Sequence, residues 1–362
     1  MKFLTVTRCI LTGAVLSVAC LMPGAAIADS GKGLAYVSNQ NGEITVIDLA
    51  TLAPVGEIDA GGGSPRGIGV TGDGSMLVSA NRDGGDIALI ERKTGKLIKR
   101  IPIGENPEFV RIRGDYAFVS FEPAAVGGPP PAPGSEEAKK LQQQREDDAE
   151  EPARIAVVDL KKGEKIREIE GGMETEGIEF SADGKNIIVT NEADENLSVH
   201  DIETGKLVKK IDTRKYGNRP RGVKMHPGGK SYAATLEYGN KLVILDGKFN
   251  ITKVVPTGEV PYGLMFDRSG DRLFVALAKG KALQVFDTKT WKPIKSIPVG
   301  DRCWHFTYTP DESHILVACG RSNDIHVIDA KTLEPVKTIE DKKLPWGIVT
   351  YPKSIGSLDM PN

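Results

Sequence analysis

The chain has 362 residues, of which 40% are hydrophobic and 27% are charged. This composition is typical of a folded globular protein and excludes a disordered chain. Without Lys2 and Arg8, which belong to an expected leader, the basic side chains fall from 47 to 45 against 49 acidic ones, a net charge of −4. That balance argues against a protein that coats nucleic acid by neutralising its phosphates.

Residues 1–28 have the features of a secretory signal peptide. A basic start precedes an apolar stretch from Cys9 to Met22, and Ala26-Ile27-Ala28 is an A-x-A cleavage site. The stretch is shorter than the roughly 20 residues of a membrane-spanning helix. Ser17-Val18-Ala19-Cys20 leaves a lipoprotein box as the alternative. We expect cleavage near Ala28 and a periplasmic or secreted protein without a transmembrane segment.

A repeated unit dominates the rest of the chain. A short apolar run that ends in an acid recurs every 41 to 45 residues, apart from one interval of 68 residues. The seven acids are Asp48, Glu91, Asp159, Asp201, Asp246, Asp287 and Asp329. Each unit contains four short strands rich in β-branched residues and separated by tight turns. Four strands in a period near 42 predict an all-β, seven-bladed β-propeller, with a two-domain β protein as the alternative.

The two ends of the chain predict how the ring closes. The mature chain begins at a second strand, Leu34 to Ser38, and the C-terminus supplies a spare first strand, Pro345 to Tyr351. Pairing these two strands would complete blade one and remove two exposed sheet edges. The propeller is therefore expected over residues 29–352, followed by a tail at 353–362.

The long interval contains an insertion in blade three, at residues 122–152. It begins with a Pro/Gly-rich stretch at 126–134, continues with a helix expected from Ser135, and ends in an acidic run at 146–151. The insertion lies between the second and third strands of its blade, on the face where every innermost strand begins. Either it is a solvated loop, or it is a lid or an arm that binds a partner.

Cys303 and Cys319 are the cysteines left after removal of the leader. They flank a hairpin turn at Thr309 to Ser313, and folding about this turn brings Cys303 opposite Gly320, one residue from Cys319. In an oxidising compartment the pair forms a candidate disulfide, and two buried thiols are the alternative.

A Pro-x-Gly pattern marks the start of the innermost strands, and its middle residue is expected to point into the central channel. The seven middle residues are Arg66, Glu108, Glu176, Arg221, Tyr262, Trp304 and Trp346. Two arginines, two carboxylates and three aromatic rings predict a ligand-binding pocket at the mouth. A ring of mutually neutralised charges that plugs the channel is the alternative. An outer ring is expected from Arg82, Glu192, Glu237 and Arg321.

No catalytic residue is assigned from the sequence. It contains no C-x-x-C-H motif for covalent haem, no G-x-S-x-G nucleophile elbow and no zinc-ligand spacing. Glu108 and Glu176 are candidate calcium ligands, although Arg66 and Arg221 would compete for them.

The blades resemble the bacterial YVTN-type seven-bladed propeller family. The motifs that carry this resemblance are Tyr36-Val37-Ser38-Asn39, Val46-Ile47-Asp48 and Pro65-Arg66-Gly67-Ile68. Within the family, Trp304 to Pro310 and the ending Leu344-Pro345-Trp346-Gly347 are most similar to propeller proteins associated with pyrroloquinoline quinone (PQQ)-dependent catabolism. The insertion and the tail depart from that pattern. The resemblance implies an exported accessory protein that works with quinoprotein alcohol or aldehyde dehydrogenases.

The leading hypothesis is therefore a non-catalytic binding protein. Its mouth would hold a protein partner, such as a quinoprotein dehydrogenase or its cytochrome, or a small anionic ligand; PQQ, a planar tricarboxylate, suits arginines beside tryptophans. A calcium-assisted lactonase-type hydrolase is one alternative. A single-strand nucleic-acid binder is another, with the net charge of −4 and the acidic insertion against it.

Overall fold

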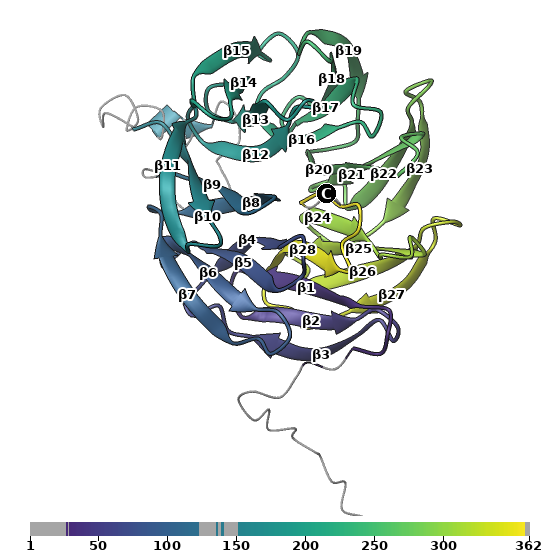
Figure 1. Cartoon of the computed structure of the whole chain (residues 1–362). Coiled ribbons are helices and arrows are strands. Elements are labelled where there is room, and N and C mark those ends of the chain that lie inside the picture. The colour runs from purple at the N-terminus through teal and green to yellow at the C-terminus, as the bar shows by residue number, and fades with distance from the viewer. Residues whose placement is uncertain (1–26, 28, 123–134, 137–138, 141–150, 359–362) are drawn as a thin grey trace, which may run out of the picture.

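The computed structural model describes residues 27, 29–122, 135–136, 139–140 and 151–358. Within these ranges the chain forms 28 strands in seven four-stranded antiparallel sheets, which are arranged in a ring around a central axis (Figure 1). The predicted seven-bladed β-propeller is confirmed. The expected signal peptide, apart from Ile27, and most of the expected insertion lie outside the described residues.

The strands follow the predicted blade pattern, with the innermost strand given first for each blade. Blade one is β28 (Pro345–Tyr351), β1 (Leu34–Asn39), β2 (Ile44–Asp48) and β3 (Ala53–Ile58). Blade two is β4 (Pro65–Val70), β5 (Met76–Asn81), β6 (Asp86–Glu91) and β7 (Leu97–Pro102). Blade three is β8 (Pro107–Arg113), β9 (Tyr116–Phe121), β10 (Arg154–Asp159) and β11 (Glu164–Glu170). Blade four is β12 (Thr175–Phe180), β13 (Asn186–Asn191), β14 (Asn196–Asp201) and β15 (Leu207–Asp212).

The remaining three blades repeat this order. Blade five is β16 (Pro220–Met225), β17 (Ser231–Leu236), β18 (Lys241–Asp246) and β19 (Ile251–Pro256). Blade six is β20 (Pro261–Phe266), β21 (Arg272–Leu277), β22 (Ala282–Asp287) and β23 (Pro293–Pro298). Blade seven is β24 (Cys303–Tyr308), β25 (His314–Cys319), β26 (Asp324–Asp329) and β27 (Pro335–Ile339).

The aspartate at the end of the third strand caps the turn that follows it in every blade except blade two, where the acid is Glu91. Asp48 Oδ1 accepts hydrogen bonds from the backbone amides of Ala50 and Thr51, at 3.0 and 2.9 Å. Asp329 does the same for Lys331 and Thr332. The carboxylate satisfies amides that the strand ladder leaves free, which explains why an acid recurs at this position.

The core consists of the faces that neighbouring blades turn towards one another. Phe118 of blade three meets Phe180 of blade four with ring centroids 5.0 Å apart, and Phe274 of blade six meets Tyr308 of blade seven at 5.8 Å. Such edge-to-face pairs add to the burial of apolar surface between blades. In the part of the chain that the structure describes, no helix has the length and apolar character needed to cross a membrane.

The C-terminal strand β28 pairs antiparallel with β1, with Val37 opposite Ile348. The chain does not leave the propeller there. The backbone N–H of Tyr308 on β24 donates to Ile355 O at 3.0 Å, and Ser357 N–H donates to Phe306 O at 2.9 Å. Residues 353–358 therefore run along an innermost strand inside the channel (Figure 1), although they were expected to lie beyond the propeller.

Cys303 and Cys319 form a disulfide, as one of the two predictions for this pair required. The two residues lie directly opposite each other on β24 and β25. The sequence placed Cys303 opposite Gly320, one residue away, because it did not include the register shift between Cys303 and His305.

Candidate binding site at the propeller mouth

A bulge in each innermost strand orients the Pro-x-Gly residues. In blade two, for example, the ladder between β4 and β5 shifts between Pro65 and Ile68, so the irregularity contains Arg66. The same shift occurs in blades three to six. A bulge re-aims the side chain that it contains, and here it turns the middle residue towards the mouth.

The glycine of the motif is required by packing between blades. A Cβ atom on Gly67 would lie 2.3 Å from Glu108 O of the next blade, and one on Gly263 would lie 2.2 Å from Trp304 O. Both distances are far below van der Waals contact, so a larger residue would push the innermost strands apart. In blades three and seven the glycine is replaced by Phe109 and His305, whose rings extend into the channel.

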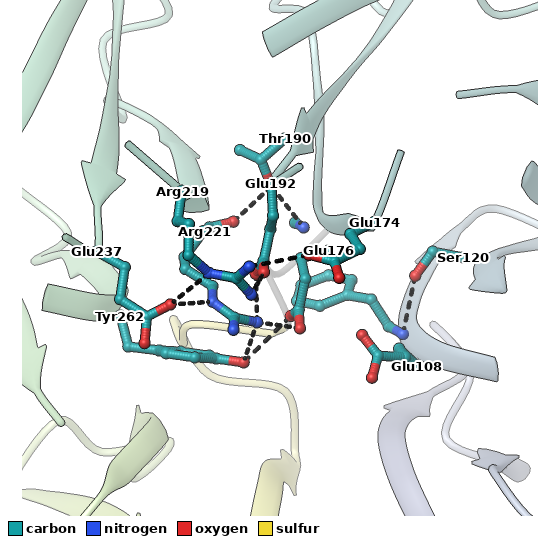
Figure 2. A network of polar contacts seen from close by, with 12 residues as sticks. Glu108, Ser120, Glu174, Glu176, Thr190, Glu192, Arg219, Arg221, Glu237 and Tyr262 are labelled. Carbon is teal, nitrogen blue, oxygen red and sulfur yellow. Dashed lines mark hydrogen bonds and ion pairs between the residues drawn. The ribbon is translucent and has the colours of Figure 1, made fainter. Parts of the chain in front are cut away.

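A hydroxyl group in the second strand links some of these neighbouring motifs. Thr190 Oγ1 accepts from Gly177 N–H at 2.7 Å and donates to Arg221 O of the next blade at 2.6 Å (Figure 2). Thr235 makes the equivalent bridge to Tyr262 O. These bridges fix the backbone of the mouth residues relative to one another.

A further ring of side chains comes from the residue immediately before each innermost strand. All seven such residues have left-handed backbones, with φ between 47° and 64°. They are Ser64, Asn106, Glu174, Arg219, Val260, Arg302 and Leu344. None is glycine, so each conformation costs about 1 kcal/mol or more and has to be held by its surroundings. In every blade except blade three, the carbonyl of the left-handed residue accepts from the residue after the second strand, as in Glu237 N–H to Arg219 O at 2.8 Å.

Arg221 lies at the centre of the charged half of the mouth. Its guanidinium contacts the carboxylates of Glu176, Glu192 and Glu237, with 2.7 Å between Nε and Glu237 Oε2, and donates to the Tyr262 hydroxyl at 3.0 Å (Figure 2). The Arg221 side chain is only 6% exposed. One buried cation therefore joins carboxylates from blades four and five.

Arg219, one of the residues with a left-handed backbone, is a second arginine that pairs with carboxylates of blades four and five. Its guanidinium pairs with Glu174 at 3.0 Å, with Glu237 at 3.4 Å and also with Glu192. Arg302 of blade seven approaches Glu237 at 3.6 Å. Each of these arginines is satisfied by carboxylates of the protein itself.

Arg66 is satisfied separately, on blade two. It forms an ion pair with Glu108 and donates from Nε to Gln40 Oε1 at 2.9 Å. The candidate calcium ligands Glu108 and Glu176 are therefore each paired with a different arginine. For the four charged middle residues, these ion pairs agree with the alternative prediction of mutually neutralised charges.

Burial divides the carboxyl groups into two kinds. Burial opposes ionisation of Glu176 and Glu237, but Arg221 and the neighbouring arginines outweigh it and hold the pKa of both groups below its usual range. For Glu192, burial outweighs Arg219 and Arg221 and raises the pKa well above its ordinary value. Burial likewise raises the pKa of Glu122, helped by the nearby Glu174. The mouth thus contains more carboxylate than its arginines can neutralise.

The other half of the mouth is aromatic. Tyr262, Trp304 and Trp346, from blades six, seven and one, are all at most 8% exposed. Trp304 lies against Gly320, where a Cβ atom would be 1.8 Å from its ring.

His305 occupies the channel beneath this sector. Its ring centroid lies 5.9 Å from Phe109, 5.8 Å from Tyr262 and 4.3 Å from Trp346. Burial lowers its pKa to about 3, so the imidazole is neutral at physiological pH. Its Nδ1 contacts the Ser357 hydroxyl of the C-terminal segment at 3.3 Å. Side chains from opposite sides of the ring and the chain's own C-terminal segment thus fill the middle of the channel.

Among the seven middle residues of the Pro-x-Gly motifs, Arg66 contacts Glu108, and Arg221 contacts Glu176 and Tyr262. Trp304 lies against Gly320, and Trp346 lies against His305. Of the expected outer ring, Glu192 and Glu237 belong to the buried network, whereas Arg82 is half-buried and Arg321 is exposed. The sequence missed Glu122, Glu174, Arg219, Arg302 and His305. The repeat itself contains the signal for three of them. Glu174, Arg219 and Arg302 each lie two residues before a middle residue of the Pro-x-Gly motif and have left-handed backbones.

A polar pocket of about 170 Å³ lies away from the mouth, between blades three and four. It is lined by Glu170, Asp194, Ser198, His200 and Lys210, among others. His200 Nε2 contacts Ser198 Oγ at 2.8 Å and Nδ1 contacts Gly205 O at 3.3 Å, so both ring nitrogens have partners. This histidine is accounted for by the packing of its blade.

Known proteins share parts of this architecture. A family model for the cytochrome D1 heme domain matches residues 151–246, which run from blade three to blade five. No curated protein sequence matches the chain. A functionally unknown protein from Desulfotomaculum acetoxidans superposes with a TM-score of 0.71 at 16% identity, over 88% of this chain and 98% of that one.

Two further solved structures have named activities. Hydrazine synthase of Kuenenia stuttgartiensis superposes with a TM-score of 0.66 at 20% identity, over 88% of this chain and 99% of that one. The dihydro-heme d1 dehydrogenase NirN, in complex with DHE, superposes with a TM-score of 0.64 at 14% identity, over 91% and 78%. At such identities the likeness establishes a common propeller fold.

Proposed function

We propose that the protein is an exported, non-catalytic binding protein that uses the mouth of its propeller to hold a protein partner. The observation that carries this proposal is the division of the mouth into two sectors. Charged side chains from blades two to five lie beside buried aromatic rings from blades six, seven and one. Adjacent charged and aromatic surfaces are typical of sites that recognise protein surfaces.

The ion pairs favour a protein partner over PQQ. Arg66 and Arg221, which would hold the carboxylates of such a ligand, are already paired with Glu108 and Glu176. A tricarboxylate would have to displace these internal partners from buried positions, at a large electrostatic cost. The mouth residues therefore do not fit PQQ, and the resemblance to PQQ-associated propellers supports a quinoprotein dehydrogenase or its cytochrome as the partner itself.

The heme d1 named in the family model and in the NirN complex also fits poorly. His305, Tyr262, Trp346 and Phe109 pack against one another across the channel. The C-terminal segment contacts His305 from below. A planar macrocycle would have to displace both, so we derive no role for heme in this chain.

The two other functions have weaker support. A calcium-assisted lactonase would need Glu108 and Glu176 to share one ion, whereas each is ion-paired with a different arginine. Binding of single-stranded nucleic acid would need unpaired cations to reach phosphates. Arg66, Arg219 and Arg221 instead pair with carboxylates.

The proposal is tested by measuring binding of the mature chain to a purified periplasmic quinoprotein alcohol dehydrogenase and to its cytochrome. Charge reversal of the exposed Arg321, at the rim of the mouth, should weaken binding, whereas Lys331→Glu in an exposed turn on the opposite face should not. Titration with free PQQ should give no saturable binding. Equal loss of affinity in both variants, or saturable binding of PQQ alone, would contradict the proposal.

A further inference from the structure

The charged network is incomplete at one point, in blade three. Asn106 and Glu122 flank the first pair of the β8–β9 ladder, in which Pro107 lies opposite Phe121. By the register of that pair Asn106 lies opposite Glu122, although Glu122 N–H donates to Glu105 O, at 3.2 Å, and not to Asn106 O. Asn106 and Glu122 are therefore cross-strand neighbours, whose side chains leave the backbone within a few ångströms of each other.

Both side chains have an acceptor oxygen without a partner. Among the described residues, Asn106 Oδ1 and Glu122 Oε1 are buried and accept no hydrogen bond. Glu122 is only 6% exposed, so water cannot solvate its carboxylate freely. A buried carboxylate oxygen without a donor costs several kilocalories per mole unless a cation or a proton neutralises it.

The equivalent positions in the next two blades show what is missing. In blade four the pair is Glu174 and Glu192, and both carboxylates contact Arg219. In blade five the pair is Arg219 and Glu237, which neutralise each other at 3.4 Å. Blade three has an amide and a carboxylate at these positions and no cation of its own.

Glu108 completes the donor set of this corner. It lies two residues after Asn106 and forms an ion pair with Arg66 through Oε1, and its second oxygen, Oε2, is the third donor of the proposed set. Carboxylate and amide oxygens are the ligands that calcium prefers, and water can supply the rest of its coordination shell. The amide carbonyl, a neutral donor, suits a cation and would gain nothing from an anion.

We propose that Asn106, Glu108 and Glu122 form a calcium-binding corner at the mouth. The ion takes the place that Arg219 of blade five has beside the carboxylates of blades four and five. This inference rests on the proposed function only in that both use the mouth as the binding face. It assigns no catalytic role to the ion, which neutralises the surplus carboxylate and fixes the loop before β8.

The test is isothermal titration of calcium into the chelator-treated mature chain, with magnesium as a parallel arm and no partner protein present. Wild-type protein should bind one calcium ion per chain and bind magnesium more weakly. Glu122→Gln should lower the affinity for calcium by at least about 10- to 100-fold, the loss seen when only an outer-shell partner of a metal ligand is removed. Asn106→Gly, which keeps the left-handed backbone, should also weaken binding.

Glu259→Gln is the matched control, because Glu259 is an exposed carboxylate at the mouth-side end of blade six and its removal should leave the affinity unchanged. Glu122→Gln should also melt at or above the wild-type temperature in chelator, since it removes a buried carboxylate with an unpartnered oxygen. Absence of calcium binding by the wild type, or equal affinities of Glu122→Gln and wild type, would overturn the inference. Because no partner is present, failure to bind a quinoprotein would not affect this result.

Discussion

Arg221→Met tests whether the buried network stabilises the propeller. Arg221 contacts three carboxylates and the Tyr262 hydroxyl while its side chain is 6% exposed, and methionine keeps much of its volume without the charge. Removing one partner of a buried ion pair costs about 3–5 kcal/mol, because the other partner stays buried without compensation. We expect the free energy of unfolding at neutral pH to fall by that amount, measured by urea unfolding with tryptophan fluorescence.

The pH dependence of this difference gives a second test. In the wild type, Arg221 holds the pKa of Glu176 and Glu237 below its unfolded value, so their stabilisation is full above the unfolded pKa and is lost as pH falls through the folded pKa. Without Arg221, burial acts on these groups against only the more distant Arg66, Arg219 and Arg302, so their folded pKa rises. The variant then regains stability as its carboxyl groups take up protons. The loss should therefore be largest at about pH 7.5 and smaller at about pH 5.

Arg268→Met is the control for this experiment. Arg268 pairs with Glu312 on the surface, where its side chain is 59% exposed, and such pairs contribute at most about 1 kcal/mol. If Arg221→Met cost no more than Arg268→Met, or if its cost did not change with pH, the mouth network would not stabilise the fold in the way described.

Three further substitutions test other parts of the structure by the same urea assay. Thr190→Val should cost about 2 kcal/mol, because it leaves a buried N–H and a buried carbonyl unpaired; Thr190→Ser should restore most of it, and equal stabilities of the two variants would contradict the bridge. Replacing Cys303 and Cys319 together by alanine should cost about 3 kcal/mol, as expected for a bridge between residues 16 apart in sequence, and a reducing agent should lower the stability of the wild type alone. Leu358→Ala should lower the free energy of unfolding by about 3 kcal/mol, because Leu358 is 1% exposed. Val336→Ala, at a position 52% exposed, should change it by less than about 0.5 kcal/mol. Equal effects would mean that the C-terminal segment does not pack in the channel.

The fold was predictable because its signals repeat. Each blade contains an acid at the end of its third strand and a variant of the same inner-strand motif, so seven weak patterns combine into one strong prediction. The residues that point into the mouth were also predictable, since a bulge at a fixed motif turns the same position inwards in each blade. Tyr262, for example, contacts Arg221 and Glu176, which are middle residues of the same pattern in other blades.

The pairing of these residues was not predictable from the sequence. Arg221 was expected to face a ligand, but its partners include Glu192 and Glu237, which come from a different position of the repeat. Arg219 takes part because its left-handed backbone turns its side chain towards the mouth. This conformation is held by hydrogen bonds to residues distant in sequence, such as Glu237 N–H to Arg219 O. Arginine has no intrinsic preference for a left-handed backbone, so the sequence does not indicate it.

The path of the C-terminal segment was missed for a similar reason. Residues 353–358 contain no alternating apolar pattern that predicts a strand. They are held by contacts with distant residues, such as the hydrogen bond from Arg111 Nη1 to Leu358 O at 2.6 Å. Arg111 itself pairs with Glu179 at 2.8 Å, so a buried ion pair on blades three and four anchors the segment.

The two blades that lack the glycine of the Pro-x-Gly motif explain why binding should be confined to the mouth. Five blades keep the small residue that lets neighbouring strands approach, while blades three and seven carry Phe109 and His305. These two rings come from opposite sides of the ring of blades and meet at 5.9 Å, above the C-terminal segment. A ligand that threads the channel would have to displace both rings and that segment. A protein partner that rests on the charged and aromatic sectors displaces none of them, and this difference is the physical reason for preferring a surface-binding role.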